Sequence, residues 1–352
     1  MSTRVVAVAG TLVVLVLAGF LAWRVFQPES SYEQALGTLP ASTLRATYTD
    51  WAAVREKAGG DGLDAGSSGT ELTGFLDRAF DQDLVTTSAI ADSTPAMRER
   101  YGVSPLDAEW EVFGQDESGQ VVVLKMAADV DLAGVEQKLR SLGYGVPDGG
   151  IGSGGTWTGS PDLVATIDGG LTPVFQNAAV LADDHLLVLS DRAEAVSRAV
   201  EVARGDASDL DEPDLARVAD EPVTAVLWGS DFACQALSMS AADQEDQRVA
   251  DRLVARAGGV SPLTGLVVAQ QDDRTIKVGL EFETDDQASE NLQPRVDLAA
   301  GAAPGQGGSF SDRFSVESGE AVGDTVVLDL APTDAQFVFS DLTSGPVLFA
   351  TC

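Results

Sequence analysis

The sequence predicts an α+β protein, with antiparallel sheets and packed helices in two similar halves, after one N-terminal transmembrane helix. Three features lead to this prediction. The chain opens with a long uncharged run, pairs of apolar segments are joined by short polar turns, and capped segments with helical spacing of apolar residues separate those pairs. The 352 residues suffice for one large domain or two medium ones.

The membrane anchor is expected within residues 1–28. Val5 to Trp23 is an uncharged run of 19 residues, which as a helix spans roughly 28 Å and matches a hydrocarbon core of about 30 Å. A cleaved signal peptide is the alternative, but its apolar region is normally about 7–15 residues long and is followed by small residues. Here the run ends in bulky and charged residues, so we expect an uncleaved anchor. Arg4 favours an N-terminus inside the cell and Arg24 opposes it, and we expect the C-terminal domain outside the cytoplasm.

The first α+β half is expected over residues 41–205, after a polar spacer over 29–40. Its predicted elements alternate between strands and capped helices. They are a strand at 43–48, a helix from Trp51 to Ala58 capped by Asp50, a hairpin at 110–115 and 120–125, a helix after Asp131, a hairpin over 179–189 and a helix up to Gly205.

The second half is expected over residues 223–352, after an acidic, Pro-containing linker over 206–222. Its predicted elements follow a similar order. They are a strand at 223–228, helices at 230–234 and 241–257, a hairpin at 265–270 and 275–282, a helix from Asp285, and strands at 313–317, 325–330, 336–339 and 347–350. The hairpin at 110–126 resembles the one at 265–282, which predicts an internal duplication. The alternative is that any α+β domain contains repeated hairpin–helix units.

Cys234 and Cys352 are the only cysteines of the chain. In an oxidising compartment an even number of cysteines favours a bridge, and two buried thiols are the alternative. Because Cys352 is the last residue, where a chain normally frays, a tether explains it more economically. We therefore expect a Cys234–Cys352 disulfide.

The charge balance excludes one class of partner. Asp and Glu number 55 against 22 Lys and Arg, a formal charge of −33. Such a surface repels phosphate backbones, so we expect no nucleic-acid partner. The acids are scattered, which favours a role in solubility over attraction of cations or basic partners.

Few residues suit catalysis or metal binding. His185 is the single histidine, so neither a Ser-His-Asp nor a Cys-His arrangement can use another, and one His with two distant Cys makes no zinc site. The spacing Gly150-x-Gly152-x-x-Gly155 lies in a Gly-rich loop without the strand and helix of a dinucleotide site. We expect no cofactor, no metal and no enzyme activity.

Two segments stay open as binding sites. The linker acids could attract calcium, but they lack the loop pattern of a calcium-binding helix pair; they are Asp206, Asp209, Asp211, Glu212 and Asp214. Trp157 lies in the Gly-rich segment 143–160, where we expect it to be exposed and to bind a ligand.

As a whole, the chain resembles the membrane-anchored envelope proteins of unknown function that are common in GC-rich Gram-positive bacteria. The resemblance rests on the anchor, the composition and the terminal Cys352. It implies a cell-membrane location and brings no catalytic residues. The leading hypothesis is a non-catalytic extracytoplasmic module that binds a protein or a cell-wall component. The alternatives are a carrier of a lipid or small apolar ligand, and a hydrolase that uses carboxylates.

Overall fold

The computed structural model describes residues 29–63, 67–230, 232–333 and 335–352. The chain divides into two compact units, residues 1–30 and residues 31–352. The anchor predicted over residues 1–28 lies outside the described residues, as does Asp231. Within the described ranges, no helix is both long and apolar enough to cross a bilayer.

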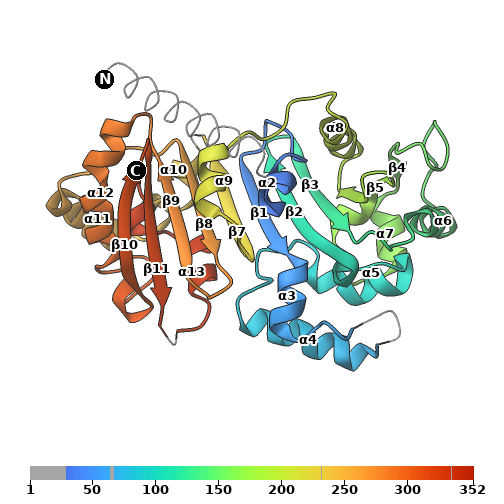
Figure 1. Cartoon of the computed structure of the whole chain (residues 1–352), viewed down its shortest axis with the longest axis horizontal. Coiled ribbons are helices and arrows are strands. Elements are labelled where there is room, and N and C mark those ends of the chain that lie inside the picture. The colour runs from blue at the N-terminus through green and yellow to red at the C-terminus, as the bar shows by residue number, and fades with distance from the viewer. Residues whose placement is uncertain (1–28, 64–66, 231, 334) are drawn as a thin grey trace, which may run out of the picture. The chain divides into compact units, whose positions relative to one another are not determined.

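The described part of residues 31–352 contains one antiparallel sheet of 11 strands (Figure 1). Their order across the sheet is β10-β11-β9-β8-β7-β1-β2-β3-β6-β5-β4. The strands are β1 (Arg45–Asp50), β2 (Ala108–Asp116), β3 (Gly119–Met126), β4 (Trp157–Thr158), β5 (Asn177–Leu181), β6 (Leu186–Ser190), β7 (Thr224–Gly229), β8 (Gly265–Gln270), β9 (Ile276–Glu281), β10 (Phe314–Val322) and β11 (Thr325–Pro332). The α+β class with a large antiparallel sheet is therefore as predicted.

The central pair of the sheet is β1 with β7, and the strand order is the same on both sides of it. Moving outward, the first half runs β1-β2-β3-β6-β5 and the second runs β7-β8-β9-β11-β10. The two-residue strand β4 is added beyond β5. The pair itself is antiparallel and continuous, from Arg45 opposite Trp228 to Thr49 opposite Thr224. The sheet is therefore continuous across the boundary between the two halves.

Helices cover both faces of the sheet, and most of their ends follow local sequence signals. Asp50 accepts a hydrogen bond from Ala53 N and begins α3, and Gly59 ends it in a left-handed conformation. Asp131 and Gly143 bound α6 in the same way. The helices are α2 (Ser31–Leu36), α3 (Trp51–Ala58), α4 (Gly69–Asp81), α5 (Thr94–Tyr101), α6 (Leu132–Leu142), α7 (Pro161–Ile167), α8 (Ala193–Ala203), α9 (Pro213–Ala219), α10 (Phe232–Ala236), α11 (Gln244–Ala257), α12 (Asp285–Ala299) and α13 (Val338–Ser344).

We call the two faces of the sheet the α8–α9 face and the opposite face. On the α8–α9 face, buried residues of α2, α8 and α9 pack on strands β1, β2, β3, β5, β6, β7 and β8. On the opposite face, α3 to α7 pack on the first half, and α10 to α13 pack on the second half. The core therefore has two layers, one on each side of the sheet.

Two segments predicted as connectors contain packed helices. The predicted spacer over 29–40 forms α2, and its Tyr32 is fully buried with the ring 5.1 Å from that of Tyr48. The predicted linker over 206–222 forms α9, whose Leu215 is fully buried. In each case a few apolar residues within a polar segment reach the sheet, and their burial offsets the cost of ordering the chain.

The end of the chain differs from the prediction. The strands predicted at 336–339 and 347–350 are wrong: α13 occupies Val338–Ser344 and a 3₁₀ turn occupies Leu348–Ala350. Short apolar runs do not distinguish a strand from a buried helix. The predicted disulfide is present, with 5.5 Å between the Cα atoms of Cys234 and Cys352. It fastens the end of the chain to the opposite face of the sheet.

Arg295 holds the same C-terminal segment. It lies in α12 and is fully buried. Its guanidinium donates to the carbonyl oxygens of Phe349 at 2.8 Å, Thr351 at 2.6 Å and Ser261 at 2.7 Å. Burial lowers the pKa of Arg295 to about 9, and the carbonyl oxygens compensate in part for the lost hydration of the charge.

Candidate functional site

Trp157 is fully buried, so the prediction that it is exposed is wrong. Its strand β4 pairs with β5, opposite Ala178. The indole packs in the core of the first half, in the same cluster as Tyr144 and Phe175. Because the glycine-rich segment closes over this core, Trp157 offers no surface to a ligand.

His185 lies in the turn between β5 and β6 with a φ angle of 53°. Its Nδ1 is buried and has no hydrogen-bond partner in the part of the chain that the structure describes. Nothing in this geometry couples the imidazole to a nucleophile or to an orienting carboxylate.

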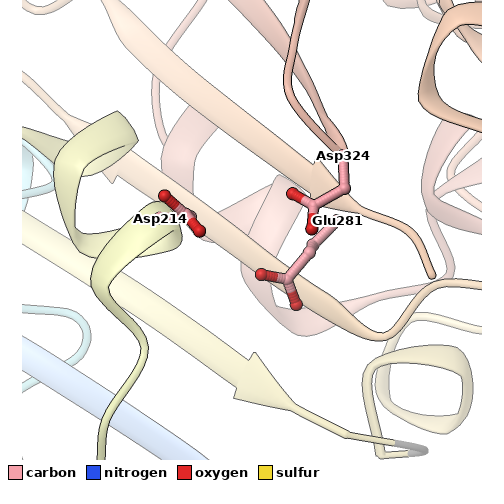
Figure 2. A group of neighbouring side chains, drawn as sticks. All are labelled: Asp214, Glu281 and Asp324. Carbon is pink, nitrogen blue, oxygen red and sulfur yellow. The ribbon is translucent and has the colours of Figure 1, made fainter. Parts of the chain in front are cut away.

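Three carboxylates from distant parts of the sequence meet at one edge of helix α9 (Figure 2). Asp214 lies in the first turn of α9, Glu281 ends β9, and Asp324 precedes β11. The tight turn between β10 and β11 places Asp324, with Gly323 at a φ angle of 61°. One oxygen atom from each carboxylate lies within 4.8 Å of the others.

Two acids at this place, Glu281 of the cluster and the neighbouring Glu212, have raised pKa values. Burial, followed by repulsion from Glu281 and Asp211, raises the pKa of Glu212 to about 7. Burial, followed by repulsion from Asp324 and Asp214, raises the pKa of Glu281, although a hydrogen bond from Thr264 opposes the rise. Within the described residues, no salt bridge reaches Glu212, Glu281 or Asp324. Carboxyl groups thus outnumber cations at this cluster, and their mutual repulsion favours the protonated forms.

Two kinds of chemistry suit such a group of carboxylates. Calcium takes oxygen ligands at about 2.3–2.6 Å, so oxygens on opposite sides of one ion lie about 5 Å apart. The spacing of Asp214, Glu281 and Asp324 meets that condition. A carboxyl group with a raised pKa can also act as a general acid. Neither Glu212 nor Glu281 lines the adjacent groove, however.

That groove has a volume of about 240 Å³ and lies beside α9 on the second half of the sheet. Five acidic or basic side chains of the strands and helix contribute to it together with apolar ones. Its lining consists of Asp214, Arg217, Val218, Lys277, Glu320, Val322, Thr325, Val327 and Asp329.

The groove lies beside α9, next to strands β10 and β11, which none of the described helices covers on this face. In β9 and β11, alternate residues such as Val278 and Leu328 are buried on the opposite face, so Lys277, Val327 and Asp329 point to the α8–α9 face. A Cβ atom on Gly319 of β10 would meet Val296 of α12 at 2.6 Å, so its neighbours in β10 also point to the α8–α9 face. We call this surface the open face; it consists of Lys277, Glu281, Ser318, Glu320, Val322, Thr325, Val327 and Asp329.

Helix α8 covers a part of the first half whose counterpart in the second half has no cover among the described helices. Helix α8 contacts β3, β5 and β6, the strands in the places of β9, β10 and β11. In the second half, α9 contacts mainly β8 and β9 and has few contacts with β11. Helix α13, which follows β11 in the chain, packs on the opposite face. Figure 1 shows α8 over the first half and α9 over the middle of the sheet. Among the described residues, no helix takes the place of α8 over β10 and β11.

Charge and exposure distinguish the open face from the rest of the sheet. Val322 is 56% exposed, and Glu320 is exposed opposite Val327. The two nearby cations are already paired, since Arg217 binds Asp214 and Lys277 binds Asp220 at 3.3 Å. The open face therefore combines partly exposed valines with unbalanced acids.

A second groove, of about 500 Å³, lies on the opposite face of the first half. It is open to solvent and its lining mixes apolar side chains with three aspartates and a lysine. The apolar side is formed by Leu63, Tyr101, Val103, Leu106, Val130 and Val135.

The comparisons with known proteins add little to these observations. No protein-family model matches the chain, and no curated protein matches it. Solved structures of TP0453 are similar in part. Crystal form IV has a TM-score of 0.40 at 11% identity, with 90% of this chain and 100% of that chain covered. Crystal form I has a TM-score of 0.37 at 10% identity, with 88% and 96% covered.

The sequence identified only part of this site. Asp214 and Glu212 belong to the acidic segment whose carboxylates the sequence offers as calcium ligands. Glu281 and Asp324 lie far from them in the sequence, and only the sheet order brings them together. One signal was present: Glu281 alternates with Val278 and Leu280 in a half-buried strand, which places it on the solvent side.

Proposed function

We propose that the chain is a non-catalytic extracytoplasmic module that binds a protein partner through the open face. The sequence-based anchor over residues 1–28 would hold it at the cell membrane. The observation that carries the proposal is that no helix among the described residues covers β10 and β11 on the α8–α9 face. A sheet face is normally covered by another element, and within the described residues this part of it carries only a groove of about 240 Å³.

The acids of the open face favour a basic partner. Acids outnumber cations here, and both cations, Arg217 and Lys277, already have acidic partners. The acids are Glu281, Glu320 and Asp329 on the open face, with Asp214 and Asp324 beside it. Complementary charge speeds association and selects among partners. A binding role needs no nucleophile activated by its neighbours. Glu212 and Glu281, whose pKa values are raised, do not line the groove.

We also infer that the two halves arose by internal duplication. The support is the shared strand order on the two sides of the β1–β7 pair. On that basis the open face is the counterpart of the surface that α8 covers in the first half. Loss of one covering helix would convert a core surface into a binding surface.

A second candidate function is carriage of a small apolar ligand, and the groove of about 500 Å³ supports it. Ligand sites typically have volumes of about 300–1,000 Å³. The three aspartates of its lining fit a lipid tail poorly. Saturable binding of a fluorescent fatty acid, lost on changing Tyr101→Asp, would favour the carrier over the binding module.

Site-specific cross-linking in intact cells tests the leading proposal. A photoreactive amino acid in place of Val322 would lie on the open face, and one in place of the exposed Glu194 would lie on α8. We expect a discrete cross-linked product from position 322 and none from position 194. Equal labelling from both positions, or none from 322, would reject the open face as the binding surface.

The membrane location needs its own test. Protease added to intact cells after removal of the wall should degrade the domain if it lies outside the cytoplasm. A protected domain would reverse the orientation, and a soluble form that begins near residue 27 would indicate a cleaved signal peptide.

A further inference from the structure

The strand at the open end of the sheet is long, and no other described strand pairs with its outer side. β10 contains nine residues, Phe314–Val322, and is the last strand of the sheet. Among the described residues, the backbone of β10 pairs with β11 alone. An edge strand of this length presents a row of N–H and C=O groups that can pair with another strand. The other edge is different, because β4 has only two residues.

The side chains of β10 continue the rows of the open face. Across the sheet, Lys277 and Asp329 lie in one row with Ser318, and Gly279 and Val327 lie in the next with Glu320. Ser318 Oγ donates to Asp329 Oδ2 at 2.6 Å. A strand added beside β10 would place alternate side chains in these same rows.

The charges at this edge select the kind of strand. Glu317 and Glu320 of β10 are exposed, and Glu317 lies at the irregularity between Val316 and Ser318. A second copy of the chain would bring the same acids, and like charges on adjacent strands are unfavourable. A strand with Lys or Arg at alternate positions would meet opposite charge instead. The same acids therefore disfavour pairing with a second copy of the chain and favour pairing with a basic strand.

We propose that β10 accepts an additional β-strand from a basic, extended segment of a partner protein, with its Lys or Arg side chains beside the acids of the open face. This inference rests on the proposed function and names the chemistry of its partner. The backbone of β10 provides the pairing. Glu317, Glu320 and Asp329 provide the preference for positive charge. The apolar side chains that alternate with the basic ones would point to the opposite face, beside Val316 and Ala321.

A synthetic peptide tests the proposal on the full-length chain in non-ionic detergent. The probe is a fluorescent ten-residue peptide of alternating Lys and Val, and its binding is measured by fluorescence anisotropy. We expect saturable binding, at least tenfold weaker binding of a peptide with Glu in place of Lys, and similar weakening when Pro interrupts the basic peptide. Equal binding of the Pro-containing peptide would overturn strand addition, because it would show that charge alone is recognised.

Two matched double variants separate the edge from the general charge of the protein. E317K with E320K changes two exposed acids of β10, whereas E194K with E201K makes the same charge change on α8. We expect the first pair to weaken binding of the basic peptide at least tenfold and the second less than twofold. Equal effects of the two pairs would overturn the proposal.

Amide hydrogen exchange locates the added strand. The bound peptide should slow exchange at least tenfold at some amides of residues 314–322, and unchanged exchange there would overturn strand addition. A dimer of the chain alone, detected by sedimentation and abolished by E317K with E320K, would identify a second copy as the occupant and also overturn it. Cross-linking from position 322 in cells with no protection of β10 would leave the proposed function standing and reject only this inference.

Discussion

Glu212 should make the stability of the folded chain depend on pH in a predictable direction. Its pKa rises from an ordinary 4.5 to about 7 on folding, because of burial and then repulsion from Glu281 and Asp211. Between these pH values the folded state binds a proton that the unfolded state has released. The free energy of unfolding therefore falls as the pH rises through this window, and above about pH 7 the whole loss is present.

The size of the effect follows from the same shift. A rise from 4.5 to about 7 corresponds to about 3 kcal/mol. Glu212 is partly exposed, so screening by solvent reduces the expected loss to about 1–2 kcal/mol. Glu212→Gln keeps the shape of the protonated side chain and removes the charge. We expect it to equal the wild type near pH 5 and to be about 1–2 kcal/mol more stable near pH 8.

Urea unfolding of the two proteins from pH 5 to pH 8, with EDTA present to remove divalent cations, measures this difference. Comparing the variant with the wild type at each pH cancels the titration of groups that they share. Glu194→Gln, on the exposed side of α8, is the matched control and should follow the wild type at every pH. If Glu212→Gln were less stable than the wild type at pH 8, the assignment of Glu212 as a repelled, buried acid would be refuted.

Three further changes test the elements that hold the core. Cys234→Ser opens a disulfide that joins residues 118 apart in the sequence, and urea unfolding should show a loss of about 5 kcal/mol in the chain-entropy model; equal stability with and without a reducing agent in the wild type would contradict this. Arg295→Ala leaves two buried carbonyl oxygens and one partly buried one without their donor and should cost about 3 kcal/mol or more, with Arg295→Lys between it and the wild type. Trp157→Ala should cost about 4 kcal/mol. Trp157→Phe should cost clearly less, because the buried Nε1 has no hydrogen-bond partner to lose among the described residues, and near-neutral unfolding of Trp157→Ala would show that the indole is not part of the core.

Local chemistry made much of the fold predictable from the sequence. The helix from Trp51 to Ala58 has the bounds that Asp50 and Gly59 indicate. The hairpin of β8 and β9 follows the alternation of apolar residues such as Ile276 and Val278. These features depend on neighbours within a few residues, so one sequence contains the needed information.

Features that depend on distant parts of the chain were missed. Trp157 lies among glycines, which suggests exposure, yet β5 supplies a pairing partner and a core for it. The run ending at Phe339 has the apolar residues of a strand, and the attachment of the C-terminal segment to the opposite face makes it helical. The carboxylates of Asp214 and Asp324 meet only because α9 lies on one face beside the turn of β10 and β11. No spacing rule within the sequence expresses that contact.

The continuous pairing of β1 with β7 determines how this chain can be divided in the laboratory. A cut in the acidic segment 206–222 would look natural from composition, but it would separate two strands that pair over most of their length, from Arg45 to Thr49 on β1. Each fragment would then carry a fresh edge strand from the centre of the sheet, rich in buried residues such as Tyr48 and Val226. Such edges associate with one another and with other chains. Fragments made at this boundary should therefore be recovered as aggregates when expressed alone, and as a complementing pair when expressed together.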